Sequence, residues 1–148
     1  MGMDVIGMNP QDPAGEYFRR NVWGWRPIAA YVETMCQSVI PDGCSVQDWH
    51  YNVGYGLPVR AAVCLADLID AQIQNGEAAE YIAQRDAELA ALPDEPCECP
   101  AHWVQNGKCR RCEGRRTVRP MDTWYVLELE DLRDFARFAR ASGGFEVW

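Results

Sequence analysis

Four cysteines and one histidine lie within sixteen residues, in the segment from Cys97 to Cys112. Two sulfurs separated by two residues can reach one metal ion from a tight turn, and Cys109 and Cys112 have this spacing. The other half of the site has two options: Cys99 with His102 keeps the same spacing, whereas Cys97 with Cys99 gives an all-thiolate site. So many metal-type ligands in a short segment predict one bound zinc ion. The spacing leaves open which four of the five residues bind it.

We expect this zinc to be structural rather than catalytic. A catalytic zinc keeps one coordination position for water and needs a general base nearby. Glu98 lies between two of the cysteines, but the surrounding residues do not match the deaminase pattern. Four protein ligands would close the coordination sphere, and a short loop with few apolar residues needs such an ion to hold its shape.

The cysteine cluster lies in a basic segment of an otherwise acidic chain. The 148 residues carry a net charge of −8, whereas residues 97–121 hold six basic residues and only two acidic ones. These bases either offset the charge of −2 that four thiolates leave on Zn²⁺, or contact the phosphates of a nucleic acid while Trp103 stacks on a base. The overall acidity argues against a general binder of duplex nucleic acid, because that affinity comes mainly from Lys and Arg.

Hydrophobic periodicity and turn residues predict an α+β fold, with a single domain over residues 1–148. Both terminal strands should join one short sheet, which about four helices cover. Residues 97–119 should form a zinc-binding loop subdomain, inserted before the last strand but one. We expect strands over 3–7, 123–129 and 145–148, and helices over 27–38, 58–75, 77–92 and 131–141.

Residues 16–26 combine aromatic rings with arginines. Aromatic rings offer flat faces for stacking, and guanidinium groups pair with phosphates, so this mixture suits a nucleotide-like ligand. The alternative is that the two tryptophans anchor the core and that the arginines are solvated. The residues that we expect to bind the ligand are Arg19, Asn21, Trp23, Trp25 and Arg26.

Catalytic residues are hard to assemble from this sequence. The chain has two histidines, so His50 is the one obvious general base once His102 counts as a candidate metal ligand. An enzyme built on His50 and Glu16 is therefore the weakest functional hypothesis, and we assign no catalytic residue. The acidic residues of 67–95 most simply form the solvated faces of two helices, although these helices could also pack against a second copy of the chain.

Cysteine use and the N-terminal residues predict a cytoplasmic protein. The seven cysteines are odd in number and include one tight cluster, which indicates metal binding rather than a disulfide framework. The first residues lack the basic and apolar regions of a secretion signal. No stretch approaches the roughly 20 apolar residues of a membrane span, so we expect no membrane contact.

Short motifs are distributed over nearly the whole chain. They are Met1-Gly2-Met3-Asp4-Val5, Asn9-Pro10, residues 15–19 with Asn21, Trp23, residues 25–27, 54–57, 92–97, Cys109-x-x-Cys112-x-Gly114, and residues 142–145. Together they resemble a family of small proteins from bacteriophages, prophages and environmental sequences. Members of that family carry two Cys-x-x-Cys-x-Gly-x-Gly knuckles similar to the zinc modules of DnaJ-type chaperones. This chain departs from the pattern in the first knuckle and at Arg116.

The resemblance implies a phage or mobile-element setting, in the cytoplasm of a bacterial host, where small accessory proteins counter host defence. Two functions suit that setting. The first is a non-enzymatic protein that sequesters a nucleotide-like small molecule in a pocket of residues 16–26. The alternative is an inhibitor that docks on a host defence protein through its acidic helices or its zinc loop.

Overall fold

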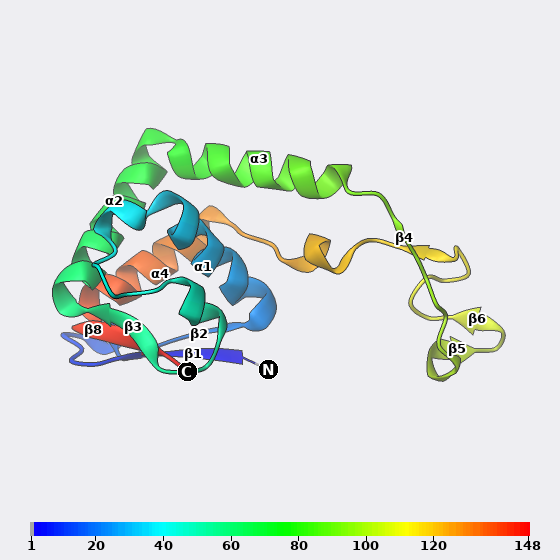
Figure 1. Cartoon of the computed structure of the whole chain (residues 1–148), viewed down its shortest axis with the longest axis horizontal. Coiled ribbons are helices and arrows are strands. Elements are labelled where there is room, and N and C mark those ends of the chain that lie inside the picture. Colours follow the sequence, from blue (N-terminus) through cyan, green and yellow to red (C-terminus); the bar gives the residue numbers. More distant parts are fainter. Residues whose placement is uncertain (1) are drawn as a thin grey trace. The chain divides into compact units, whose positions relative to one another are not determined.

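The structure is a computed structural model that describes residues 2–148, and these form two compact units. One unit combines the chain up to Ala83 with Tyr125–Trp148, and we call it the core unit. The other is Gln84–Trp124, which we call the cysteine unit. Figure 1 colours the chain from end to end, so that the cysteine unit runs from green to pale orange. This unit is larger than the predicted subdomain of residues 97–119.

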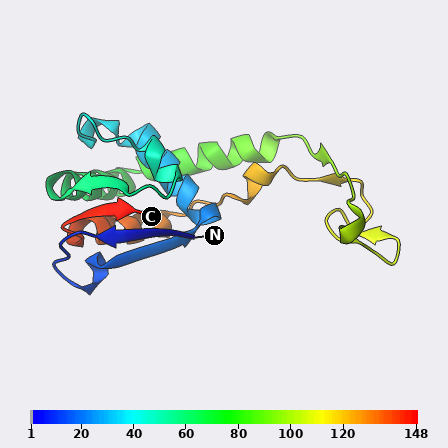
Figure 2. The same ribbon diagram turned by 60° about the horizontal axis from the view of Figure 1, so that its bottom comes forward.

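The core unit contains a four-stranded antiparallel sheet in the order β2-β1-β8-β3. The first and last strands are direct neighbours, with Val5 opposite Val147. Figure 2 shows the strands of both chain ends side by side. The predicted sheet with both terminal strands is therefore confirmed. The strand bounds are β1 Gly2–Gly7, β2 Tyr17–Asn21, β3 Tyr55–Pro58 and β8 Gly144–Val147.

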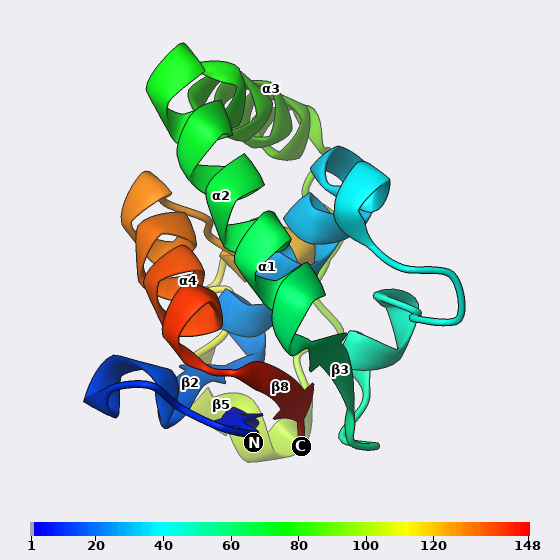
Figure 3. The same ribbon diagram turned by 90° about the vertical axis from the view of Figure 1, so that its left-hand side faces the viewer.

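Four α-helices complete the predicted α+β fold. They are α1 Val22–Met35, α2 Val59–Asn75, α3 Glu77–Ala91 and α4 Leu129–Ala141. Figure 3 shows α2 and α4 lying side by side above β8. Gly76 ends α2 with a left-handed φ of 92°, a conformation that glycine adopts without the strain of a Cβ.

An aromatic cluster fills the space between the sheet and the helices. Phe18 and Phe145 point inward from the strands because alternate strand residues face the same side. Phe135 of α4 lies 5.4 Å from Phe18, 5.5 Å from Trp25 and 5.7 Å from Phe145, measured between ring centroids. All four rings are at most 6% exposed. Burial of this aromatic area stabilises the core unit.

The predicted strand over residues 123–129 is wrong. Residues 121–124 form a short 3₁₀ turn, and the chain then runs irregularly to Glu128, which caps α4. The Glu128 side chain accepts from the backbone of Asp131, and the Asp131 carboxylate accepts from the Glu128 N–H at 3.0 Å. This reciprocal capping box starts a helix where β propensity alone favours a strand. Val126 is accordingly 57% exposed rather than buried in a sheet.

Helix α1 also begins earlier than the sequence predicts. The side chain of Asn21 accepts a hydrogen bond from the N–H of Gly24 at 2.9 Å, so the helix starts at Val22 rather than at Pro27. Pro27 then lies inside the helix.

The cysteine unit contains the last part of α3, two small antiparallel ladders, and 3₁₀ turns at Ala101–Trp103 and Met121–Trp124. Strand β4 (Glu95–Pro96) pairs with β7 (Thr117–Val118), and β5 (Val104–Gln105) pairs with β6 (Lys108–Cys109). The 3₁₀ turn at Ala101–Trp103 precedes β5. Among residues 2–148, no helix is both long enough and apolar enough to cross a membrane.

Candidate metal centre

Four cysteine side chains meet in the cysteine unit. The Sγ atoms of Cys97, Cys99, Cys109 and Cys112 all lie within 4.8 Å of one another. The Cys97 and Cys109 sulfurs are 3.8 Å apart, and those of Cys99 and Cys112 are 3.7 Å apart. A disulfide needs a separation of about 2.05 Å, so these thiols are free.

The distances fit a tetrahedral metal site. Four sulfurs placed about 2.3 Å from one zinc ion lie about 3.8 Å from each other, and the Cys97–Cys109 and Cys99–Cys112 pairs have this separation. Cys97, Cys109 and Cys112 are buried and Cys99 is half-buried. Four ligands of one chemical type close the coordination sphere, which is typical of a structural rather than a catalytic site.

The ladder of β4 and β7 positions the first pair of cysteines. Cys97 follows β4 directly, and its N–H donates to the carbonyl of Arg116 at 2.8 Å, which extends the ladder by one step. Cys99 has a φ of 47°. This left-handed conformation is uncommon for a residue with a side chain. It turns the chain sharply, so that both sulfurs of the Cys-x-Cys pair reach one centre.

The hairpin of β5 and β6 positions Cys109. Its turn is Asn106-Gly107, with φ values of 51° and 75°. A type I′ hairpin loop needs positive φ at both of its residues, which explains the Asn-Gly pair. Cys109 lies opposite Val104 in this hairpin and is held by the ladder.

A tight turn brings Cys112 back to the same centre. The N–H of Glu113 donates to the Cys109 carbonyl at 2.7 Å, and the N–H of Arg115 donates to the Cys112 carbonyl at 2.9 Å. Glu113 and Gly114 continue the turn with φ values of 53° and 88°. The backbone therefore returns toward β7 and closes the loop between the two ladders.

Backbone N–H groups favour the charged form of Cys112. Burial opposes ionisation of this thiol, but hydrogen bonds from the backbone of Arg116 and Gly114, with the neighbouring thiols of Cys99 and Cys97, lower its pKa to about 7. A metal ligand has to be a thiolate. The turn thus favours the ionised state of the sulfur that a metal would bind.

The sulfurs are most of what the cysteine unit buries. Its buried cluster comprises Cys97, Cys109, Cys112 and Val118, with Cys99 packed against it. One valine cannot offset the conformational entropy that a loop of this length loses on folding. The donor set and the lack of other buried apolar side chains in this cluster both fit a bound metal ion.

His102 lies outside the group of four sulfurs. It is exposed on the 3₁₀ turn before β5, with its ring 6.1 Å from that of Trp103. The structure therefore favours the all-thiolate option that the spacing had left open.

The five predicted ligand-binding residues do not form one pocket. Trp25 is fully buried, and its indole N–H donates to the carbonyl of Trp49 at 2.7 Å, so the expectation that it stacks on a ligand is corrected. Residues two apart on a helix lie on opposite faces, so Trp23 and Trp25 diverge once residues 22–35 are helical. Asn21 uses its carboxamide oxygen to cap this helix.

Trp23 and Arg26 meet at a third residue, Tyr125. The rings of Trp23 and Tyr125 are 4.7 Å apart between centroids, and a guanidinium nitrogen of Arg26 lies 3.2 Å from the Tyr125 hydroxyl. Tyr125 did not figure among the predicted site residues. It comes from the segment that the sequence predicted as a strand, and no local signal connects it with α1.

Arg19 lies apart from Trp23 and Arg26, on β2. Its guanidinium is 3.5 Å from the Asp4 carboxylate, and with Gly2, Arg20 and Asn21 it lines an open hollow of about 470 Å³. The adjacent Arg20 pairs with Asp131 and Asp134 of α4, so its guanidinium joins β2 to α4.

The remaining candidate residues also have structural partners. His50 lies 3.9 Å from Glu33 rather than beside Glu16, and burial, outweighing Glu33, lowers its pKa from 6.5. On α2, Asp67 and Asp70 accept from Arg140 of α4 at 2.7 and 2.9 Å. Two carboxylates of the predicted acidic face therefore form ion pairs that join α2 to α4 within the core unit.

No family model, curated protein or solved structure matches this chain. The resemblance to phage proteins, and the setting that it implies, therefore stay predictions.

Sequence reasoning missed the hairpin that positions Cys109. The signal was present, because Asn106-Gly107 is the strongest short-range indication of a two-residue hairpin. In this hairpin Cys109 pairs with Val104 and the next backbone bond joins Arg110 to Trp103, so the register places His102 beyond the pair that contains Cys109. Recognising it would have favoured the four cysteines over the histidine.

Proposed function

We propose that the four cysteines hold one structural Zn²⁺ ion and that the protein is a non-enzymatic binding protein whose cysteine unit folds around that ion. The observation that carries the proposal is the grouping of four sulfurs within 4.8 Å of one another, with two pairs at 3.8 and 3.7 Å, the edge length of a zinc–thiolate tetrahedron. Zinc is favoured over harder cations because thiolates are soft ligands.

The arrangement supports binding rather than catalysis. Four protein ligands leave no position for a metal-bound water, which a catalytic zinc needs. In the core unit, His50 lies 3.9 Å from Glu33 of α1, and Glu33 also accepts a hydrogen bond from Gln47 at 3.0 Å. These side chains are therefore engaged with one another. The proposed role of the metal is to give a short polar segment a fixed surface.

Metal content tests the proposal directly. Native mass spectrometry of the purified protein, compared with its denatured mass, should show one zinc ion per chain. Cys112→Ser and Cys97→Ser should each abolish or strongly weaken zinc retention, because a serine hydroxyl is a poor ligand for zinc. A wild-type protein that is folded and carries no zinc would overturn the proposal.

Two control variants separate coordination from a general effect of losing a thiol. Cys64→Ser changes an exposed cysteine of α2 and should keep a full zinc load. His102→Ala should also keep it, because the ring lies outside the group of sulfurs. A His102→Ala variant that loses zinc would instead favour a site of three cysteines and this histidine.

The earlier hypotheses of ligand sequestration and of host-protein inhibition rest on less. With Trp25 buried and Asn21 capping a helix, a nucleotide-like ligand would use the hollow lined by Gly2, Arg19, Arg20 and Asn21. An inhibitor would more readily use the zinc loop than the acidic helices, because Asp67 and Asp70 pair with Arg140. A co-purified small molecule in the native spectrum would favour sequestration.

A further inference from the structure

The basic residues of the cysteine unit differ from those elsewhere in their partners. The chain has 14 lysines and arginines, and five of them, at positions 108, 110, 111, 115 and 116, lie around the metal centre. Among the described residues none of these five forms an ion pair, whereas seven of the other nine do. All five are exposed. The fold of the chain therefore does not use these charges to bind its own carboxylates.

The metal centre does not account for all of this positive charge. Residues 97–121 carry six bases and two acids, a formal charge of +4. Four thiolates on one Zn²⁺ contribute −2, so the segment keeps about +2. Arg119 of this segment pairs with Asp94, which leaves an unpaired excess of about +1 in a chain whose total without metal is −8. An excess of unpaired positive charge on an otherwise acidic protein indicates an anionic partner.

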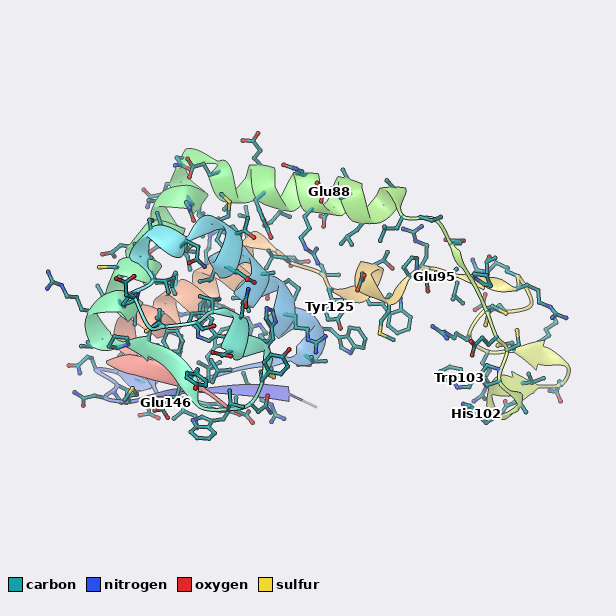
Figure 4. The ribbon with its side chains drawn as sticks, viewed as in Figure 1. Glu88, Glu95, His102, Trp103, Tyr125 and Glu146 are labelled. Carbon is teal, nitrogen blue, oxygen red and sulfur yellow. The ribbon has the colours of Figure 1, made fainter. Side chains whose placement is uncertain are left out.

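An exposed tryptophan lies beside these charges. Trp103 is 42% exposed, and Val104 next to it is 39% exposed. The N–H of Arg110 donates to the Trp103 carbonyl at 2.8 Å, so the backbone that carries the indole is tied to the segment that carries Arg110 and Arg111. Figure 4 shows His102 and Trp103 close together, beside β5. The unit thus presents a flat ring and several cations on a short, metal-pinned backbone.

We propose that this surface, which comprises Trp103, Lys108, Arg110, Arg111 and Arg116, binds single-stranded nucleic acid. A base of a single strand can stack on Trp103 while the adjacent phosphates contact the cations. The proposal rests on the zinc site proposed above, because the metal fixes the loop that carries these residues.

A single strand fits this surface better than a duplex does. A duplex exposes its bases only as edges in the grooves, and reading them needs a helix or a two-stranded ribbon that enters the major groove. The ladders of this unit are two residues long in each strand. An acidic peptide would match the charge, but it offers no series of flat rings for Trp103.

Fluorescence anisotropy with labelled oligonucleotides of about 12 nucleotides tests the proposal. The zinc-loaded protein should bind single-stranded DNA or RNA at about 50 mM salt and bind the matching duplex and polyglutamate more weakly. Each phosphate contacted on a single strand should contribute about −0.7 to the slope of log affinity against log salt. Equal binding to the duplex, or tighter binding to polyglutamate, would overturn it.

Matched variants locate the contact. Trp103→Ala should weaken binding by about fivefold to 100-fold, which corresponds to the stacking of one base. Trp148→Ala removes a tryptophan of similar exposure, 47%, from the core unit and should leave binding unchanged. Arg110→Ala with Arg111→Ala should reduce the salt slope, and Arg133→Ala with Arg137→Ala on α4 should not.

Zinc content measured on the same samples separates the two proposals. Variants of Trp103, Arg110 and Arg111 should retain one zinc ion, since none of these side chains is a ligand. A zinc-loaded protein that ignores single strands would refute the nucleic-acid surface and leave the metal site intact. A protein without zinc would instead refute the metal site on which the surface rests.

Discussion

The two units of this chain bury different kinds of side chain. The core unit buries aromatic and aliphatic side chains between a sheet and its helices, with Trp25, Phe135 and Phe145 fully excluded from solvent. In the cysteine unit, the buried cluster is three cysteines and Val118, with the half-buried Cys99 packed against them. Apolar burial adds many small contributions that reinforce one another. A metal site instead concentrates the stabilisation in one ion, so that its loss removes nearly all of it at once.

The same contrast applies to charge. In the core unit, arginines such as Arg20 and Arg140 each bind two carboxylates across different elements, so charge there joins helices and strands. Around the metal centre the bases remain without ion pairs among the described residues. With the proposed zinc ion, the fold of this unit does not need these charges, and they stay available to a partner.

Removing the metal should have the largest effect, and it should be confined to one unit. A strong zinc chelator should unfold residues 97–119. Structural zinc sites contribute an apparent binding free energy of about 10 to 16 kcal/mol at neutral pH, and this energy is also folding energy. Hydrogen exchange resolved by peptide should show loss of protection there and unchanged protection in α2, α4 and the sheet. Cooperative loss of protection in both units would show that they are not independently stabilised.

Phe135→Ala should have the next largest effect, in the opposite unit. This ring contacts Phe18, Trp25 and Phe145, so its removal leaves a cavity that should cost about 3 to 5 kcal/mol of unfolding free energy. Thermal unfolding followed by near-ultraviolet circular dichroism would measure the loss. Native mass spectrometry of the same variant should still show one zinc ion per chain, and a zinc-free variant would contradict the independence of the two units.

Local sequence signals predicted the helices and both terminal strands of the core unit, but they missed β2 and β3, which complete its sheet. Apolar spacing and Gly76 located α2 closely, and the apolar runs at both ends located β1 and β8. In the segment at 123–129, β propensity favours a strand, but the capping box of Glu128 and Asp131 starts α4 at Leu129 instead. The sequence also did not reveal that Trp25 is buried and Trp23 is not, because that depends on α1 beginning at Val22 rather than at Pro27.

The metal centre was predicted as a set of candidates rather than as a geometry. Ligand spacing identified all four cysteines and added His102, because spacing alone treats Cys99-x-x-His102 as equivalent to Cys109-x-x-Cys112. The distinction depends on backbone conformation, namely the left-handed φ at Cys99 and the hairpin turn at Asn106-Gly107. Tertiary pairing of β4 with β7 brings Cys97 into the site, and that pairing has no local sequence signal.

Gly107→Ala should have a smaller effect on the cysteine unit than metal removal. The residue has a φ of 75°, where a Cβ costs about 1 to 2 kcal/mol. Since folding of this unit and zinc binding are coupled, zinc affinity should fall by about 5-fold to 30-fold while the ligand set stays complete. Competition with a chromophoric chelator would measure the change. Gly43→Ala, at a φ of 86° in a core-unit turn, is the matched control and should leave zinc affinity unchanged.

The smallest expected effect is a pH dependence that separates the two units. Burial, opposed by Glu33 and reinforced by Arg26, lowers the pKa of His50 below its ordinary 6.5 in the folded core unit. The unfolded chain therefore binds more protons just below pH 6.5, and the stability of the core unit should fall as the pH drops through that range. His50→Gln should flatten this slope in urea unfolding of the core unit.

The cysteine unit also loses stability on acidification, because protons compete with the metal for the thiolates, and His50→Gln should leave that loss unchanged. An equal slope in the variant and the wild type would show that His50 does not contribute, and a change in zinc release would show that the two units are coupled.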